Sequence, residues 1–358
     1  MALLVDGHCH SVLAADLDRP AFELACSEAD LPPPAGVSYL DSQLGLGVRR
    51  WCAPVLDLPA SVGIDDYLAR RAALGWRAAT AALLRAAGLS ALLVDTGLAG
   101  PLVDLGTLAE LAGAPVREVV RLEAVAEGMV GAVDAAGFAA AFVDTLSSRL
   151  AGAVAVKSII AYRYGLAIPP TRPTRVEVWR AAGNWLRTGG RLTDPVLLRH
   201  VLWAGVDTGL PIQLHTGFGD RDVALRAADP ALAQPFLAAI SAPVVLLHCY
   251  PYHRQAGWLA QVYPHVHLDV GLTVGHLGVR AGPVLGEFFE LAPFGKVLFS
   301  TDAYLLPELY LVGAAQFRAS WRWLVDGWLR DGALTATDAD RIEGLVSAGN
   351  AHRLYSCD

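Results

Sequence analysis

The chain has 358 residues, of which 54% are hydrophobic and 18% are charged, and 28 basic side chains stand against 35 acidic ones. This composition excludes the clustered basic surface of a nucleic-acid-binding protein, and no uncharged apolar run of about 18 residues is present to span a membrane. Five scattered cysteines, with no basic leader before the first apolar run, lead us to expect a reduced, cytoplasmic protein.

Eight short apolar runs recur along the chain, and each is typical of a strand buried on both faces of a parallel sheet. Helical periodicity lies between several of them, and a closing helix pair is expected at the carboxyl end. This alternation predicts an α/β fold, a (β/α)8 TIM barrel, as a single domain over 1–358. The predicted strands cover 3–10, 91–97, 119–127, 153–163, 211–217, 243–250, 266–272 and 296–304, and the predicted helices cover 61–88, 134–152, 194–209, 252–264 and 334–355.

Two connections are longer than the loops of a plain barrel. Residues 11–60 follow the first strand, and we expect them to form an insertion or cap near the site. A smaller insertion at 164–193 follows the fourth strand and contains several prolines, so we expect a lid or loop there.

Polar side chains stand where the apolar runs end, and in a barrel these carboxyl ends converge on one mouth. His8 and His10 lie two residues apart, so both point to the same side of the first strand. Imidazoles with a carboxylate suit zinc and its neighbours, and a catalytic site keeps one position open for water. We therefore predict one or two divalent ions, Zn²⁺ first and Mn²⁺, Fe²⁺ or Ni²⁺ as alternatives. The other strand-end residues are Glu123, Lys157, His215, His248 and Asp302.

Lysine is rare in this chain, because Lys157 and Lys296 are its only two lysines. A lysine amine can lose its proton, whereas an arginine guanidinium cannot, and a neutral amine can react with carbon dioxide to form a carbamate that bridges two metals. The carbamate is our interpretation of Lys157, and the alternative is a lysine neutralised by an ion pair with Glu123 or Asp302. Lys296 begins the eighth strand and is expected to be structural.

Together these motifs resemble the amidohydrolase superfamily and, within it, the amidohydrolase 2 branch. The resemblance extends over nearly the whole chain, with 11–60 the least familiar part, and is strongest to the subgroup that includes the N-terminal half of fungal proteins fused to a glutamine-synthetase-like domain. It implies that His8, His10 and Asp302 hold one metal. His215 and His248 would hold a second or position the substrate, and Lys157 would bridge two metals as a carbamate. The motifs are HxH at 8–10 and the stretches 154–166, 210–220, 245–260, 298–310 and 349–355.

The resemblance also implies a reaction, in which metal-activated water attacks a carbonyl carbon of a C–N bond, such as a γ-glutamyl-type amide. Asp302 would carry the proton from water to the leaving group, while the metal or His248 polarises the carbonyl oxygen. We expect Tyr162 and Arg163 at the rim, where a guanidinium suits a substrate carboxylate or forms a structural salt bridge. Glu123 is expected to contact the substrate or to support a ligand from behind.

Other functions stay open at this point. A metal-dependent non-oxidative decarboxylase of the same branch would need one metal and an unmodified Lys157, and a lactonase is a further alternative. A non-catalytic metal-binding or partner-binding barrel would show a damaged ligand set, and none of the six predicted ligand positions is damaged. The expected partner is a small-molecule substrate, and the resemblance adds a homodimer as one assembly open to the chain. Among the other histidines, His276 follows the seventh strand and can reach the mouth.

Overall fold

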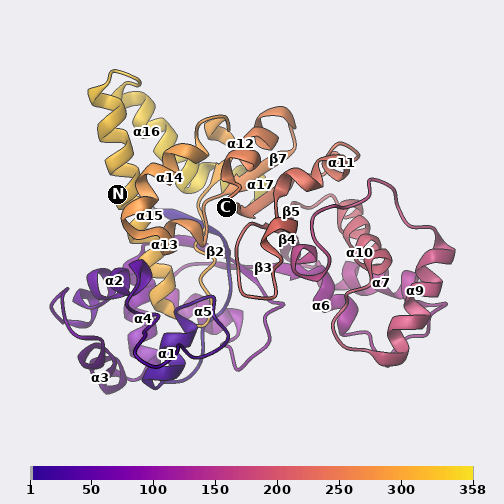
Figure 1. Cartoon of the computed structure of the whole chain (residues 1–358), viewed down its shortest axis with the longest axis horizontal. Coiled ribbons are helices and arrows are strands. Elements are labelled where there is room, and N and C mark those ends of the chain that lie inside the picture. Colours follow the sequence, from indigo (N-terminus) through magenta and orange to yellow (C-terminus); the bar gives the residue numbers. More distant parts are fainter. Residues whose placement is uncertain (1–2, 358) are drawn as a thin grey trace.

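Residues 3–357 are described by the computed structural model, and their strands form one parallel sheet in the order β1 to β8 (Figure 1). After β8 the chain bonds back to β1, because the amide of Gly7 donates to the carbonyl of Phe299 at 3.1 Å and the amide of Asp302 donates to the carbonyl of His8 at 2.9 Å. These bonds bring the sheet round into a barrel, and the predicted (β/α)8 fold is confirmed. The strands are β1 (Leu4–Cys9), β2 (Leu89–Asp95), β3 (Val116–Arg121), β4 (Ala153–Ser158), β5 (Ile212–Thr216), β6 (Val244–His248), β7 (Val266–Asp269) and β8 (Val297–Leu298).

The inward side chains of the strands change from apolar to polar toward the carboxyl ends. In a strand the inward positions recur every second residue. The next inward positions after Leu93, Val119 and Ala155 are therefore Asp95, Arg121 and Lys157. A polar layer thus lies at the carboxyl mouth of the barrel, beyond an apolar plug. The plug is one buried cluster formed by Val5, Ala91, Leu93, Val119, Ala155, Val245, Leu247 and Leu298, joined from the carboxyl end of the chain by Ala351, Tyr355 and Cys357.

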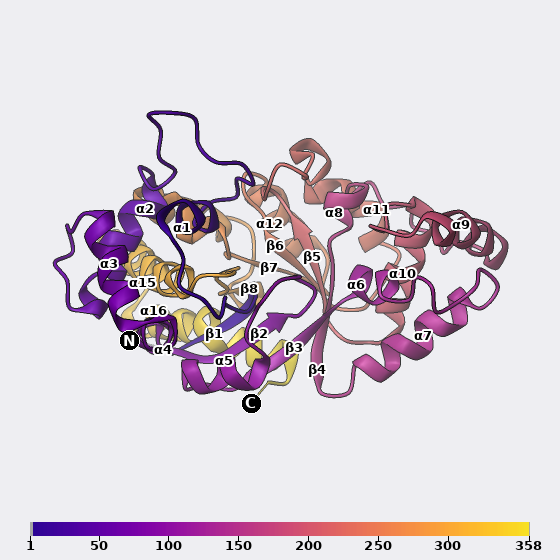
Figure 2. The same cartoon turned by 90° about the horizontal axis from the view of Figure 1, so that it is seen from below.

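Helices surround the sheet and gather into two groups beyond it. In Figure 2 the helices α1, α2 and α3 lie at one end of the molecule, and α7, α9 and α10 lie at the other. None of the helices between residues 3 and 357 combines the length and the hydropathy that a membrane crossing requires. The helices are α1 (Arg19–Ala25), α2 (Gln43–Gly47), α3 (Ile64–Leu74), α4 (Trp76–Ala87), α5 (Leu105–Ala112), α6 (Leu122–Glu127), α7 (Phe138–Arg149), α8 (Ile160–Arg163), α9 (Arg175–Thr188), α10 (Pro195–Asp207), α11 (Gln234–Leu237), α12 (His253–Val262), α13 (Thr273–Leu277), α14 (Ala281–Phe288), α15 (Pro307–Arg330), α16 (Ala336–Gly344) and α17 (Asn350–Tyr355).

The long segment after β1 is tied to the body of the protein through a buried charge cluster. It carries α1, α2 and the short helical turns Val48–Cys52 and Pro54–Leu56 before α3 begins. From α3, the hydroxyl of Tyr67 and the Nε of Arg71 both donate to Oε1 of Glu308 on α15, each at 2.8 Å. A buried carboxylate needs such partners, because an unpaired buried charge is costly. The cluster therefore fixes this segment against the helix that follows β8.

Several predicted elements differ from the structure. The strand expected over 153–163 ends at Ser158 before α8 begins, and the strand expected over 296–304 is confined to Val297–Leu298. The helix expected over 61–88 is broken at Gly75, whose φ of 77° ends α3 before α4 begins. The strand expected over 119–127 ends at Arg121, and α6 follows at once. The region 164–193, expected to be a lid or loop, contains the 14-residue helix α9, whose N-terminus is closed by a capping box of Thr174 and Glu177. The prediction gave weight to the neighbouring prolines and overlooked apolar residues at helical spacing. These residues are Val178, Ala181, Ala182 and Trp185.

Candidate active site

Three imidazoles gather around one carboxylate at the carboxyl mouth of the barrel. The Nε2 atoms of His8 and His10 lie 3.1 and 3.6 Å from Oδ1 of Asp302, and Nε2 of His248 lies 3.5 Å from its Oδ2. The three histidines are buried, and the Asp302 side chain is 13% exposed. Residues from β1, the end of β6 and the segment after β8 therefore meet at one point, although they are up to 294 positions apart in the chain.

The protonation states in this cluster favour binding of a cation. Burial lowers the pKa of His8 to about 4 and that of His248 to about 3, so both rings are neutral at pH 7 and each keeps a nitrogen lone pair. Burial would raise the pKa of Asp302, but the neighbouring rings of His248, His10 and His8 hold that pKa well below its usual value. The cluster thus offers an ionised carboxylate beside neutral imidazoles, which is the state in which these groups ligate a metal.

The ring orientations of the histidine pair on β1 are fixed from behind. The side-chain amide of Gln213 donates from Nε2 to the carbonyl of Gly7 at 2.6 Å, so its Oε1, 2.8 Å from Nδ1 of His8, is an acceptor. Nδ1 of His8 must therefore carry the proton, which leaves the lone pair on Nε2, the atom that faces Asp302 and Lys157. In the same way, Nδ1 of His10 faces the carbonyl of Asp95 at 3.1 Å and must donate to it. Such contacts set the tautomer of metal-binding histidines.

Two of the clustered residues adopt backbone conformations that non-glycine residues rarely use. His248 has a φ of 65° and Asp302 a φ of 52°. The carboxylate of Asp269 holds the first by accepting from the amide of His248 at 2.7 Å. The carboxylate of Asp6 holds the second by accepting from the amide of Thr301 at 2.9 Å. Strain of this kind persists only where surrounding contacts enforce it, and it concentrates at functional sites.

His215 stands beside this cluster on β5. Its ring centroid lies 4.7 Å from that of His248 and 4.4 Å from that of Tyr162. The strands that carry the two histidines approach closely at Gly217, where a Cβ would lie 2.3 Å from the carbonyl oxygen of Tyr250 and φ is 76°. Glycine is needed there for both reasons, and it lets His215 and His248 lie side by side.

The donor atoms of the cluster fit a metal ion. Among residues 3–357, the buried atoms without a hydrogen-bond partner include Nε2 of His215, both ring nitrogens of His248 and Oδ1 of Asp302. Buried polar atoms are normally satisfied, so such a concentration indicates a missing partner. Donor atoms within 4.8 Å of one another are offered by His8, His248 and Asp302, and also by His8, His10 and Asp95. This set of nitrogen and oxygen ligands is typical of zinc and related divalent metals.

Lys157 reaches the same cluster from β4. Its Nζ lies 2.8 Å from Nε2 of His8 and 3.6 Å from Oδ2 of Asp95. Its ion-pair partner is therefore Asp95, in place of the expected Glu123 or Asp302, and Asp95 is also bound by Arg121 at 2.7 Å. Burial lowers the pKa of the Lys157 amine, which favours the uncharged form.

Glu123 lies behind this layer, in the first turn of α6, where the sequence predicted a position on the third strand. Its Oε1 accepts from the hydroxyl of Ser158 at 2.6 Å and from the amide of Ile159 at 3.1 Å. It is fully buried and is absent from the residues that line the adjacent cavity. The geometry therefore gives Glu123 a supporting contact with the chain just after Lys157, and the direct substrate contact considered for it is not seen.

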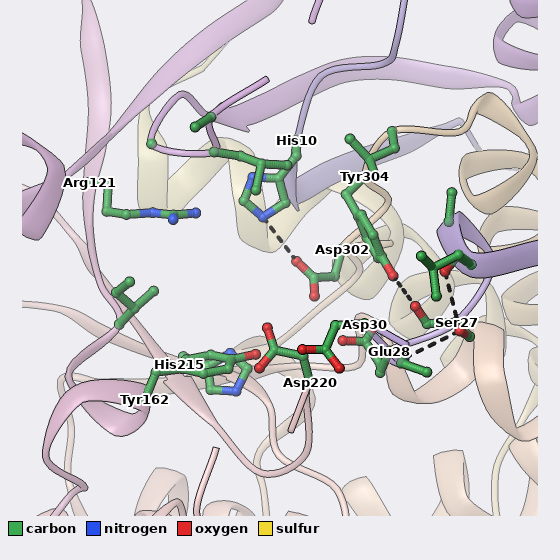
Figure 3. Close-up of a pocket in the computed structure, with 18 of the residues that line it drawn as sticks. His10, Ser27, Glu28, Asp30, Arg121, Tyr162, His215, Asp220, Asp302 and Tyr304 are labelled. Carbon is green, nitrogen blue, oxygen red and sulfur yellow. Dashed lines mark hydrogen bonds and ion pairs between the residues drawn. The ribbon is translucent and has the colours of Figure 1, made fainter. Parts of the chain in front are cut away.

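A cavity of about 750 Å³ opens from the metal-ligand cluster toward solvent (Figure 3). Tyr162 and Arg163, which the sequence placed at the rim, both line it. The Arg163 side chain is 7% exposed, and its Nη2 lies 3.2 Å from Oε1 of Glu127. Its Nε and Nη1 are buried without a partner among residues 3–357. The residues that line the cavity include His10, Arg121, Lys157, Arg191, His215, Asp302 and Tyr304, with Leu17, Leu24, Glu28 and Asp30 from the segment after β1 and Asp220 after β5.

Four residues of the site had not been selected from the sequence. Asp95 and Arg121 end β2 and β3, so the rule that identified Lys157 and His215 also applies to them. Gln213 occupies a mid-strand position, and only its contact with β1 across the barrel reveals its role. Glu28 lies in the segment 11–60, where no periodicity or motif indicated which side chains face the cavity. By contrast, Lys296 is structural as expected, since its Nζ donates to the carbonyls of Ala260 and Tyr263, each at 2.7 Å.

Known proteins show the same family pattern and the same fold. A sequence model of the amidohydrolase family matches residues 6–356. A proposed metal-dependent hydrolase from Lactobacillus casei ATCC 334 is 29% identical and superimposes with a TM-score of 0.88, covering 99% of this chain and 96% of that one. The uronate isomerase of Thermotoga maritima superimposes with a TM-score of 0.63 at 13% identity, covering 99% of this chain and 94% of that one, and so shares the fold alone.

A fungal relative matches only part of the chain. Protein fluG of Emericella nidulans is 33% identical over 219 residues, which make up 56% of this chain and 25% of fluG. The matched region therefore spans about a quarter of that relative, and what the whole of fluG does is not transferred to this chain.

Proposed function

Since the chain belongs to the amidohydrolase family, we propose that it is a metal-dependent hydrolase of C–N bonds, with amides of γ-glutamyl type as its substrates. The observation that carries this proposal is the meeting of four imidazoles and one ionised carboxylate beside a cavity, with ring nitrogens left unpartnered. The similarity to a proposed metal-dependent hydrolase supports it.

In this proposal the residues of the polar layer form one metal site and a second site for a metal or the substrate. His8, His10 and Asp302 hold one ion, proposed to be Zn²⁺, and His215 and His248 hold a second ion or position the substrate. When bound, such an ion supplies a Lewis acid and lowers the pKa of a coordinated water from 15.7 to about 7. The remaining steps belong to the side chains of the protein itself.

Asp302 is the proposed proton carrier. Because neighbouring imidazoles keep it ionised, its carboxylate can accept a proton from the attacking water and deliver that proton to the nitrogen of the leaving group. His248 is neutral and therefore keeps one N–H, which can donate to the substrate carbonyl oxygen if a single metal binds. The substrate carboxylate is proposed to lie against Arg163, which lines the cavity and keeps two buried N–H groups without a partner among residues 3–357.

Lys157 is proposed to carry a carbamate in the two-metal state. Its lowered pKa makes the neutral amine accessible, and attack of the nitrogen on carbon dioxide forms an N–C bond as one proton leaves to solvent. The product is an anionic group that replaces the direct contact of Nζ with His8. Metal content near two ions per chain, with an added mass of one carbon dioxide on Lys157, is the expected signature.

The proposal is tested on the purified protein by metal analysis together with a substrate screen. We expect hydrolysis of γ-glutamyl amides that is lost after chelation and returns on adding Zn²⁺, with Mn²⁺, Fe²⁺ and Ni²⁺ compared in parallel. Lactones and aromatic acids complete the screen. Release of carbon dioxide from an acid without cleavage of any amide, at one metal per chain, would instead identify a decarboxylase. Activity that survives thorough chelation would refute the metal-dependent mechanism.

A further inference from the structure

The wall of the cavity contributed by the segment after β1 contains a buried acceptor atom with no donor. Glu28 lines the cavity, its side chain is 22% exposed, and its Oε1 is buried without a hydrogen-bond partner among residues 3–357. A buried carboxylate oxygen in this state costs free energy unless a donor arrives. Neither the metal-ligand cluster nor the proposed reaction uses this residue.

A second unpartnered acceptor faces the first. Nδ1 of His276 lies 2.9 Å from the carbonyl oxygen of Leu272, which can only accept, so Nδ1 carries the ring proton. Burial lowers the pKa of His276, and its Nε2 is therefore a bare lone pair at pH 7. This Nε2 lies 4.0 Å from Oε1 of Glu28 and also has no partner among the described residues. At that separation the two atoms cannot bond each other whether or not Glu28 carries a proton, but one N–H donor between them can reach both.

The carboxylates around this acceptor pair favour a donor that carries a positive charge. Burial, reinforced by the neighbouring carboxylates of Asp302 and Asp220, raises the pKa of Glu28 to about 8. A positive charge placed there would be attracted by all three carboxylates and would restore ionisation of Glu28. Figure 3 shows Glu28, Asp30 and Asp220 grouped together, with Asp302 between them and Arg121.

Arginine side chains line the same cavity. They are Arg121, Arg163 and Arg191, and Arg163 keeps two buried N–H groups that no atom of residues 3–357 partners. Acidic and basic side chains thus share one cavity, and Figure 3 shows Asp302 between Arg121 and Glu28. Glu28 also borders a second hollow of about 470 Å³, which His276 lines as well, so the acceptor pair stands where the two spaces meet at Glu28.

We propose that the cavity selects substrates that carry a carboxylate at one end and a cationic nitrogen at the other, with Glu28 and His276 as the residues that bind the cationic nitrogen. The proposal deepens the proposed function, because it places the scissile bond between two oppositely charged ends. An ammonium group can donate charge-assisted hydrogen bonds to Glu28 and use a remaining N–H to donate to His276. An uncharged analogue lacks these contacts.

Binding of matched acids tests this without any hydrolysis. The probes are ω-amino acids from 4-aminobutyrate to 8-aminooctanoate, each paired with the fatty acid in which a methyl group replaces the ammonium. Calorimetric titration of the Zn²⁺-loaded protein at pH 7 measures both affinities. For at least one chain length, we expect the amino acid to bind about 10- to 100-fold more tightly than its methyl partner. Without a cation site, burial of the methyl group makes the fatty acid the tighter ligand at every length.

Variants assign the effect to the acceptor pair. Glu28→Gln should abolish the preference for the ammonium while leaving fatty-acid affinity unchanged, and His276→Asn should reduce the preference in part. Asp30→Asn is the matched control, since Asp30 also lines the cavity but is already paired with Arg221 at 2.6 Å, and it should keep the preference. Thermal unfolding and metal content check that each variant is folded and loaded.

The outcomes separate this inference from the proposed hydrolysis. Preference for fatty acids by the unmodified protein, or an ammonium preference that survives Glu28→Gln, would overturn the cation site even if amides are cleaved. An ammonium preference that is lost in Glu28→Gln would support the site even if no amide in the substrate screen is hydrolysed.

Discussion

The inner end of the cavity and its outer wall are built in different ways. Lys157 and His215 lie on the adjacent strands β4 and β5, and His10 directly follows β1. Glu28 and Arg163, by contrast, come from the connections after β1 and β4. Strand-borne side chains are held by the sheet and by contacts such as those of Gln213 and Asp269. Glu28 and Arg163 lie outside the sheet, and in the described part of the chain both keep polar atoms without a hydrogen-bond partner, as the inner cluster does. This division assigns the chemistry to the barrel and the choice of substrate to its connections.

Among substitutions at the inner end and the outer wall, that of Asp302 is expected to lower activity most. Asp302→Asn should lower kcat/KM by about 10³-fold or more, because it removes the proposed proton carrier and an anionic metal ligand. Asparagine tolerates the positive φ at this position, so the loss would be chemical rather than conformational. Steady-state kinetics with metal analysis measures the effect. The exposed Asp144→Asn serves as control, and an active, metal-loaded Asp302→Asn protein would contradict the assignment.

A smaller effect is expected for a residue that orients a metal-binding side chain but does not touch the substrate. Gln213→Met removes the acceptor that orients His8, so metal affinity should fall by about 10- to 100-fold. Competition with a chelating dye measures the affinity. Tyr355→Phe is the matched control, because it removes the hydroxyl that Gln213 contacts at 3.0 Å but leaves the contact with His8. Equal affinities for Gln213→Met and the unmodified protein would show that His8 is oriented by other contacts.

Substitution in the outer wall should change recognition and leave the chemical step nearly intact. Arg163→Met should raise KM for a carboxylate-bearing amide by about 10-fold while kcat changes little, because the lost contacts are made equally in the bound and transition states. A substrate in which a neutral amide replaces the carboxylate should show no such change. Arg149→Met is the control, since Arg149 is exposed, is paired with Glu118 at 2.9 Å and is not one of the residues that line the cavity. A loss confined to kcat would place Arg163 in the chemistry instead.

The sequence revealed the inner region better than the outer one. Apolar runs that end in His8, His10, Lys157, His215 and His248 identified the strands and the polar layer together, because one periodicity governs both. The same periodicity would have selected Asp95 and Arg121, had it been applied to every strand end. The predicted end of a strand was wrong where a helix follows without a loop, as at Arg121. There the last residues of β3 and the first residues of α6 read as one largely apolar run.

The outer region depends on contacts that no local pattern encodes. Glu28 and His276 are 248 positions apart in the chain, and each looks like an ordinary polar residue of a connection. Their unpartnered atoms face one another only because the segment after β1 packs back over the barrel mouth. The same holds for Glu308, whose bonds to Tyr67 and Arg71 anchor that segment.

By itself the sequence determined the barrel, its polar mouth and the residue types able to hold a metal, because these follow from the period of two and from the placing of polar groups at strand ends. Only the tertiary structure decided that Asp95 pairs with Lys157 and that Gln213 sets the tautomer of His8. It also decided that acidic and basic side chains line one cavity. The physical reason is that a hydrogen bond or ion pair acts over a few ångströms in space, and only folding brings positions hundreds of residues apart within that range.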